Sequence, residues 1–168
     1  DGLSQGERTE VLLSARRDFS SLRRLAHINI VLLLGAVNDP PTNTLGLLIE
    51  RASRGSLRDM LNDAPSHVVG VEKVQLRLAA GIAAGMAYLH AANPVVLHHD
   101  LKSANVLVFT DELGTFTPKL CDFGLASIVG GTTAAVSRRA GAGTTAYMAP
   151  EQGDDEMTTK SEVYSFGI

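Results

Sequence analysis

A stretch of 22 residues, from Leu78 to His99, contains no Asp, Glu, Lys or Arg. Apolar residues recur there and just before it at every third or fourth position, as on one face of a helix; they are Val71, Val74, Leu78, Ile82, Met86 and Leu89. Asn93-Pro94 ends the pattern, because a proline disfavours helical geometry in the residue before it. The sequence therefore predicts a long helix over residues 71–91 whose apolar face must be covered.

A membrane-spanning helix is the alternative for this stretch, since about 20 apolar residues cross a bilayer. Gly81 and Gly85 form a GxxxG match, which is typical of closely packed membrane helices. However, the apolar part stops near Ala92, many of its residues are weakly apolar alanines, and polar residues such as Asn93 and His98 follow. We therefore favour a buried helix of a globular domain, with no membrane span in this segment.

Shorter patterns surround this helix. Apolar spacing predicts an amphipathic helix over residues 11–25, and two apolar runs, 30–37 and 45–49, predict a hairpin whose first strand is buried. Ser56 has the properties of a helix N-cap, with Asp59 three residues later. Small strands are expected at residues 95–97, 106–109 and 119–121, before a long Gly-, Thr- and Ala-rich loop over 124–161 and an apolar helix start at 162–168.

Composition narrows the class of protein. The 168 residues suggest one domain, and 45% hydrophobic and 20% charged residues are usual for a globular chain. The 15 basic and 18 acidic residues give a net charge of −3, which disfavours binding to a nucleic-acid polymer, because such binding needs a positive surface. The single cysteine, Cys121, excludes an intrachain disulfide.

Three motifs follow the long helix in order. Residues 98–105 read His-His-Asp-Leu-Lys-Ser-Ala-Asn, residues 122–124 read Asp-Phe-Gly, and residues 149–151 read Ala-Pro-Glu. The order and spacing match the catalytic-loop, D-F-G and A-P-E signatures of protein kinases. From about residue 12 to residue 168 the chain resembles a protein kinase of the Ser/Thr type, closest to the tyrosine-kinase-like group.

This resemblance implies chemical roles for four polar residues. Asp100 would orient the substrate hydroxyl and accept its proton, and Lys102 would place a cation on the γ-phosphate of ATP and favour Ser/Thr acceptors over Tyr. Asn105 and Asp122 would supply oxygen ligands to Mg²⁺. We expect these four residues to converge on one cleft. Asp100, Lys102 and Asn105 taken alone fit a capped turn with a surface ion pair, but their motif context favours catalysis.

The resemblance also implies an adenine site. Ile49 occupies the gatekeeper position, the backbone from Glu50 to Ala52 would meet the adenine, and Leu107 would pack beneath it. Thr144 resembles a threonine that contacts the catalytic Asp and Lys. Four residues resemble the stacked spine of the family, although ordinary core packing predicts nearly the same for them: Leu22, Leu33, His98 and Phe123.

Some parts of the family pattern differ or are not found. No Gly-rich loop or strand lysine precedes the motifs, and no Lys occurs before Lys73. Asp18 occupies the position of the usual helix glutamate, His99 that of an Arg which binds a phosphate, and Glu162 that of an Asp which braces the catalytic loop. We therefore expect these 168 residues by themselves to be inactive.

Together these observations predict an α+β, protein-kinase-like two-lobe fold. Residues 1–50 would form a partial N-lobe with one helix and two strands, and residues 51–168 the first part of a mainly helical C-lobe. The predicted function is ATP- and Mg²⁺-dependent phosphorylation of Ser/Thr hydroxyls on protein substrates, inside the cell and in the cytoplasm or on the cytoplasmic side of a larger protein. The alternative is a degenerate kinase-like module that binds nucleotide or a partner without transferring phosphate.

Overall fold

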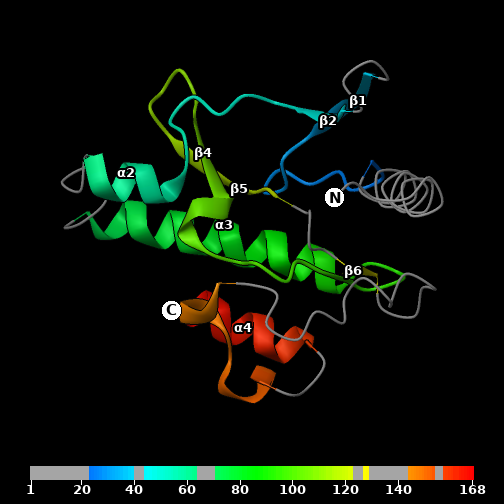
Figure 1. Ribbon diagram of the computed structural model, residues 1–168. Helices are drawn as coiled ribbons and strands as arrows, with labels where there is room; N and C mark the ends of the chain where they lie inside the picture. Colours follow the sequence, from blue (N-terminus) through cyan, green and yellow to red (C-terminus); the bar gives the residue numbers. More distant parts are fainter. Residues whose placement is uncertain (1–22, 40–43, 64–70, 123–126, 129–143, 154–156) are drawn as a thin grey trace. The chain divides into compact units, whose positions relative to one another are not determined.

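The computed structural model describes residues 23–39, 44–63, 71–122, 127–128, 144–153 and 157–168. Within these residues it contains three α-helices and three pairs of strands (Figure 1). In chain order they are β1 (Leu33–Asp39), β2 (Thr44–Ile49), α2 (Leu57–Asp63), α3 (Glu72–His90), β3 (Val96–Leu97), β4 (Val106–Thr110), β5 (Phe116–Leu120), β6 (Ser127–Ile128) and α4 (Thr159–Gly167). The architecture is α+β, as the sequence predicts. The chain divides into a smaller unit, residues 1–26 and 32–51, and a larger unit, residues 27–31 and 52–168.

The smaller unit contains the predicted hairpin. β1 pairs with β2 in antiparallel register from Leu33 opposite Ile49 to Asp39 opposite Thr44. The prediction that the first strand is buried is wrong, because Leu34 and Val37 are each 57% exposed. Two strands alone cover neither of their own faces, and among the described residues no further strand pairs with them. The helix predicted over residues 11–25 lies almost wholly outside the described residues.

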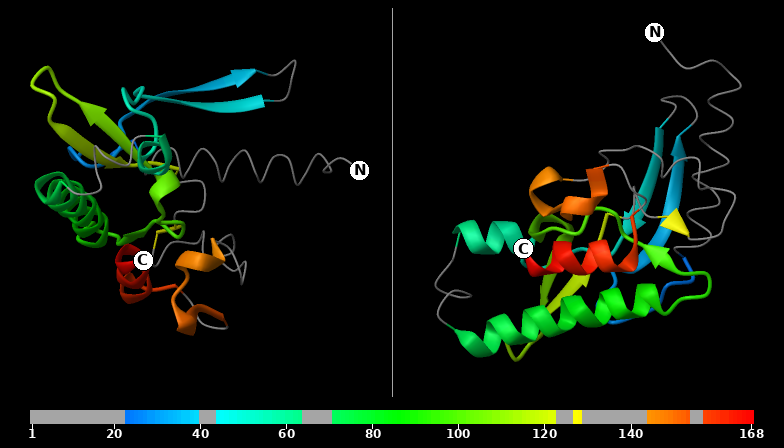
Figure 2. Two further views of the ribbon diagram at one scale, coloured as in Figure 1. Left: turned by 90° about the vertical axis from the view of Figure 1, so that its left-hand side faces the viewer. Right: turned by 90° about the horizontal axis from the view of Figure 1, so that it is seen from below.

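Helix α3 is the long helix that the periodic apolar residues predict. It packs against β5 (Figures 1 and 2), its buried residues include Leu78, Met86 and Leu89, and Leu78 belongs to one apolar cluster with Val108 of β4. In the part of the chain that the structure describes, no helix is long and apolar enough to cross a membrane. The uncharged stretch therefore supplies the buried face of a helix packed on a sheet.

The two glycines of the GxxxG match allow α3 to approach β5 closely. A Cβ atom on Gly81 would lie 2.6 Å from the Cγ of Pro118, and one on Gly85 would lie 2.8 Å from the backbone oxygen of Asn29. Asn29 is buried, and its side-chain amide donates to the Pro118 carbonyl at 2.8 Å. The two glycines therefore let α3 pack closely against Pro118 of β5 and the backbone of Asn29.

Two segments extend the hairpin of β4 and β5 on either side. On the β5 side, Leu120 donates from its backbone to Asn29 and accepts from Val31, both at 2.9 Å. On the β4 side, Val108 donates to the Gly55 carbonyl at 2.9 Å and accepts from the backbone of Arg54 at 3.1 Å. Val108 and Leu120 are completely buried. This sheet with α3 forms the main core of the larger unit.

Hydroxyl side chains set the starts of the two shorter helices. Ser56 caps α2, as predicted, since its Oγ accepts from the Asp59 amide at 3.1 Å and Asp59 accepts from the Ser56 amide at 3.0 Å. α4 begins at Thr159, three residues before the predicted start at Glu162. Thr158 and Ser161 form a reciprocal capping box there, which places Glu162 inside the first turn of the helix.

We expect Gly81→Ala and Gly85→Ala each to lower the free energy of unfolding of the natural protein by about 1–3 kcal/mol, because the new methyl groups overlap Pro118 and Asn29. Alanine gains up to about 1 kcal/mol in helix propensity, so a loss means that the overlap dominates. Gly167→Ala in α4 is the matched control, since its Cβ would meet no described atom within 4 Å. Chemical denaturation measures all three, and equal stability of the Gly85 and Gly167 variants would contradict the close packing.

Candidate catalytic site

The loop from His98 to Asn105 connects β3 to β4 and carries the first motif. His98 is 1% exposed, and its Nε2 lies 2.9 Å from the Cys121 carbonyl. Burial holds the pKa of His98 below its ordinary value, so the ring is neutral near pH 7. Because a carbonyl can only accept, Nε2 carries the proton and Nδ1 accepts from the Asp100 amide at 3.3 Å. His98 thereby joins the catalytic loop to the strand end that precedes Asp122.

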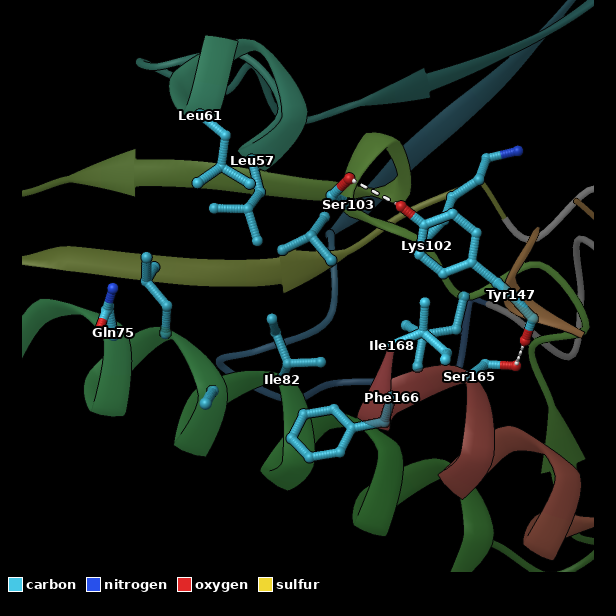
Figure 3. Close-up of a pocket in the computed structure, with 14 residues that line it drawn as sticks. Leu57, Leu61, Gln75, Ile82, Lys102, Ser103, Tyr147, Ser165, Phe166 and Ile168 are labelled. Carbon is cyan, nitrogen blue, oxygen red and sulfur yellow. Dashed lines mark hydrogen bonds between the residues drawn. The ribbon is translucent and has the colours of Figure 1, made fainter. Parts of the chain in front are cut away.

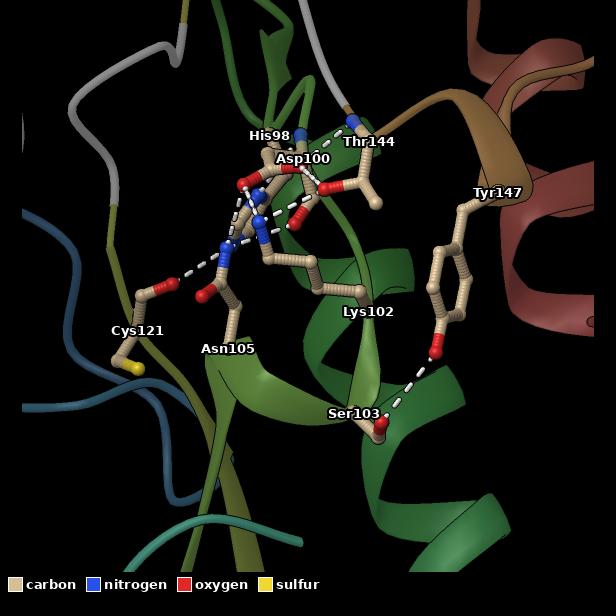
Figure 4. A network of polar contacts seen from close by, with 8 residues as sticks. All are labelled: His98, Asp100, Lys102, Ser103, Asn105, Cys121, Thr144 and Tyr147. Carbon is tan, nitrogen blue, oxygen red and sulfur yellow. Dashed lines mark hydrogen bonds and ion pairs between the residues drawn. The ribbon is translucent and has the colours of Figure 1, made fainter. Parts of the chain in front are cut away.

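The carboxylate of Asp100 is surrounded by donors (Figure 4). Its Oδ1 accepts from the amide of Thr144 at 3.2 Å and from the Thr144 hydroxyl at 3.0 Å. Its Oδ2 accepts from Lys102 Nζ and, at 2.9 Å, from Asn105 Nδ2. Burial raises the pKa of Asp100, but hydrogen bonds from Lys102 and Thr144 outweigh it and keep the pKa below the ordinary value. Asp100 is therefore ionised at neutral pH.

Lys102 and Asn105 each make a second contact that fixes their position. Lys102 Nζ also donates to the Thr144 hydroxyl at 2.8 Å, so the ammonium group lies between two oxygen atoms. Asn105 is buried, and its Nδ2 also donates to the Asp100 backbone carbonyl at 2.9 Å. Because the Asn105 amide nitrogen is turned toward Asp100, its side-chain oxygen points away from that carboxylate (Figure 4).

Asp122 reaches the same region through the hairpin of β4 and β5. Asn105 comes immediately before β4, and Cys121 immediately after β5. The backbone amide of Cys121 donates to the Asn105 carbonyl at 3.0 Å, so Asp122 follows directly on a residue bonded to the catalytic loop. Asp122 is exposed and has a φ of 62°, in the left-handed region. The structure thus brings Asp100, Lys102, Asn105 and Asp122 to one end of the hairpin.

The predicted adenine residues fall in both units. Ala52 and Leu107 are partly buried in the larger unit, where Leu107 pairs with Ser56 and with Lys119. Ile49 and Glu50 belong to the smaller unit, where the Glu50 carboxylate accepts from the Leu32 amide at 2.8 Å. Among the other predicted residues, Asp18, Leu22 and Phe123 lie outside the described residues.

Glu162 braces the catalytic loop from α4. Its side chain is almost completely buried; Oε1 accepts from the His99 amide at 2.6 Å, and Oε2 lies 2.7 Å from His90 Nε2 at the end of α3. His99 has a φ of 68°, a conformation that is strained for a side chain with a Cβ. The hydrogen bond that the His99 amide donates to Glu162 helps to hold this strained residue directly before Asp100. Burial also lowers the pKa of His99, so the residue in the position of the usual Arg is neutral.

A cavity of about 390 Å³ lies beside the catalytic loop (Figure 3). Its lining is largely apolar and comes from α2, α3, the catalytic loop and α4, including Leu57, Leu78, Ile82 and Phe166. Lys102 and Ser103 contribute to it from the loop, and Tyr147 from the turn after Thr144. Asp100, Asn105 and Asp122 do not line it, whereas Lys102 does, so the cavity adjoins the polar site around Asp100 through Lys102.

Comparison with known proteins identifies the family. The protein kinase domain family matches residues 4–168. The chain belongs to the protein kinase family. It is 42% identical to the serine/threonine-protein kinase CTR1 of Arabidopsis thaliana over 90% of this chain and 18% of that protein. It is 41% identical to the serine/threonine-protein kinase PBS1 of the same plant over 88% of this chain and 32% of that protein. A probable serine/threonine-protein kinase of Dictyostelium discoideum, drkD, is 36% identical over 95% of this chain and 12% of that protein.

The chain therefore spans less than a third of the length of each of these relatives.

The sequence places Glu162 at the position of an Asp that braces the catalytic loop, but it did not identify His90 as a partner of Glu162. It also missed Tyr147, whose hydroxyl lies 3.3 Å from Ser103. The available signal for His90 was its position at the C-terminal end of the predicted helix, where a residue can reach an adjoining element.

We expect His90→Ala to lower the stability of the kinase domain by about 1–3 kcal/mol, because it leaves the buried Glu162 carboxylate with one donor fewer. His90→Gln should recover part of this loss, since its amide can still donate to a carboxylate. Chemical denaturation compares the two variants. A His90→Ala variant as stable as the wild type would show that the contact contributes nothing.

Cys121 should react slowly with alkylating reagents in the folded kinase domain. It is 7% exposed, and burial raises the pKa of its thiol from 9.0 to about 11, which lowers the thiolate population about a hundredfold. Labelling with iodoacetamide at about pH 8, followed by mass spectrometry, measures the rate. Denatured protein serves as the reactive control, and equal rates in folded and denatured protein would contradict the burial.

Proposed function

We propose that this kinase domain transfers the γ-phosphoryl group of ATP to Ser or Thr hydroxyls of protein substrates. The observation that carries the proposal is the set of four donors around the Asp100 carboxylate, which come from Lys102, Asn105 and Thr144. Phosphoryl transfer requires mainly positioning and charge stabilisation from the protein. Aligned groups around one ionised carboxylate are suited to that task.

In this proposal Asp100 orients the attacking hydroxyl and accepts its proton. The lowered pKa of Asp100 keeps the carboxylate ionised and able to accept a hydrogen bond at neutral pH. Lys102 Nζ, held between Asp100 and Thr144, supplies a positive charge next to the acceptor group. Such a cation stabilises the negative charge that develops on the transferred phosphoryl group.

The side-chain oxygen atoms of Asn105 and Asp122 are also suited to binding Mg²⁺. Asn105 keeps its amide nitrogen on Asp100 and turns its oxygen away, and Asp122 contributes an exposed carboxylate from the adjoining strand end. Magnesium takes hard oxygen ligands and usually only one or two carboxylates from the protein, together with phosphates and water. When bound, the ion would neutralise charge on the ATP phosphates. Asn105 and Asp122 are the residues that would hold it.

For the nucleotide base we propose the residues that the family resemblance implies, namely Ile49, Glu50, Ala52 and Leu107. We also propose that residues 1–50 belong to the N-lobe and residues 51–168 to the C-lobe of the kinase fold. The reaction would take place inside the cell, in the cytoplasm or on the cytoplasmic side of a larger protein. The degenerate, non-catalytic alternative finds no support among the relatives above, which are named as serine/threonine kinases.

Asp100→Asn in the full natural protein tests the proposal. The amide keeps the size of the side chain but cannot accept a proton, so phosphate transfer should fall by about 10²- to 10⁴-fold, while ATP binding changes little. The assay uses radiolabelled ATP, Mg²⁺ and a degenerate peptide library with Ser, Thr or Tyr at the central position. Asp63→Asn, at the exposed end of α2, is the matched control.

A wild-type protein that labels no Ser or Thr peptide, or an Asp100→Asn variant with most of the wild-type turnover, would overturn the proposed function. Labelling of the Tyr library at a rate equal to the Ser and Thr libraries would overturn the proposed acceptor class.

A further inference from the structure

Tyr147 connects three parts of the larger unit. Its hydroxyl lies 3.3 Å from Ser103 Oγ in the catalytic loop, and its backbone carbonyl accepts from Ser165 Oγ of α4 at 2.7 Å (Figure 3). Its backbone amide donates to the Thr144 carbonyl at 2.8 Å, which closes the turn over residues 144–147. One tyrosine thus contacts the catalytic loop, α4 and the turn that begins at Thr144.

The same turn determines where Thr144 meets the catalytic aspartate. Thr144 contacts Asp100 with its amide and its hydroxyl, and the hydroxyl also accepts from Lys102. The catalytic loop and the turn are therefore joined at two places, one at Thr144 and one at Tyr147, and Lys102 and Ser103 are neighbours on the loop side (Figure 4). Loss of the Tyr147–Ser103 contact would therefore change how the turn positions Thr144 against Asp100.

The Tyr147 hydroxyl and the Ser103 hydroxyl form a hydrogen bond in which either oxygen can be the donor. The Ser103 contact, and after it the Arg58 guanidinium on α2, lower the pKa of the Tyr147 hydroxyl against the effect of burial.

We propose that Tyr147 is a positioning residue for phosphate transfer, which holds Thr144 against Asp100 through its bonds to Ser103 and Ser165. This inference rests on the proposed function. The ring of Tyr147 also lines the apolar cavity, so a purely structural role would depend on the ring, whereas the positioning role depends on the hydroxyl. Removing the hydroxyl alone separates the two.

The test compares Tyr147→Phe, Ser103→Ala and the double variant in the full natural protein, with Tyr164→Phe as the matched control. Tyr164 is 41% exposed on α4. The kinetic assay uses ATP, Mg²⁺ and the Ser and Thr peptide libraries. Each single variant should lower kcat about fivefold, the value of one neutral hydrogen bond, and leave the KM for ATP unchanged. The double variant should lower kcat no further, because both changes remove the same bond.

A second readout does not depend on activity. Hydrogen exchange at the Thr144 amide reports its bond to Asp100, and it should become about threefold faster in Tyr147→Phe and in Ser103→Ala but not in Tyr164→Phe. Unchanged Thr144 exchange in Tyr147→Phe overturns the inference, as does a wild-type kcat in that variant or additive losses in the double variant. A wild-type protein without phosphate transfer overturns the proposed function instead, and the exchange measurement then decides the positioning role alone.

Discussion

The antiparallel pairing of β4 with β5 is the constraint on which the candidate site depends. The two strands carry the catalytic-loop motif at the start of one and the Asp-Phe-Gly motif at the end of the other, so their register decides whether the motifs meet. Val106 opposite Leu120 places Asn105 beside Cys121, and the backbone bond between these two closes the pair. A slip of one residue would turn every side chain of the slipped strand to the opposite face and would shift Asp122 relative to the loop. The complete burial of Val108 and Leu120 against α3 resists such a slip.

Two carboxylates organise the polar groups around this frame in different ways. Asp100 has four donors and stays partly accessible, so its charge is stabilised where chemistry can use it. Glu162 is 1% exposed and uses its two oxygens on His90 and on the His99 amide. A buried carboxylate without such donors would be costly, so its location is fixed as firmly as that of an apolar core residue. The longer side chain of Glu, compared with Asp, serves here to bond two elements at once.

Much of the candidate site could be predicted because its residues are close in sequence. Asp100, Lys102 and Asn105 lie within one loop, and a motif of fixed spacing reports such a group directly. The long helix was predicted because its apolar face repeats over 19 residues. Features formed between distant segments were missed, since neither His90 with Glu162 nor Ser103 with Tyr147 shares a local pattern. β5 begins at Phe116, whereas the sequence predicted a strand only from residue 119. Pro118 lies within β5, and a proline disfavours a strand except at positions where no backbone N–H is needed for pairing. The prediction that β1 is buried was wrong, because the apolar composition of a strand does not show whether another element covers it.

The route of the chain has a consequence for how the larger unit folds. Residues 27–31 belong to that unit, but the chain leaves it to form the β1–β2 hairpin and returns at residue 52. The contact of Asn29 with Pro118 spans 89 residues, and the backbone bonds between Asn29, Val31 and Leu120 span similar separations. Contacts between such distant positions form slowly, because a long loop must close before they contribute. On the ribosome, the segment around Asn29 is therefore synthesised well before its partner strand, and the edge of the central sheet is completed only after β5 has emerged.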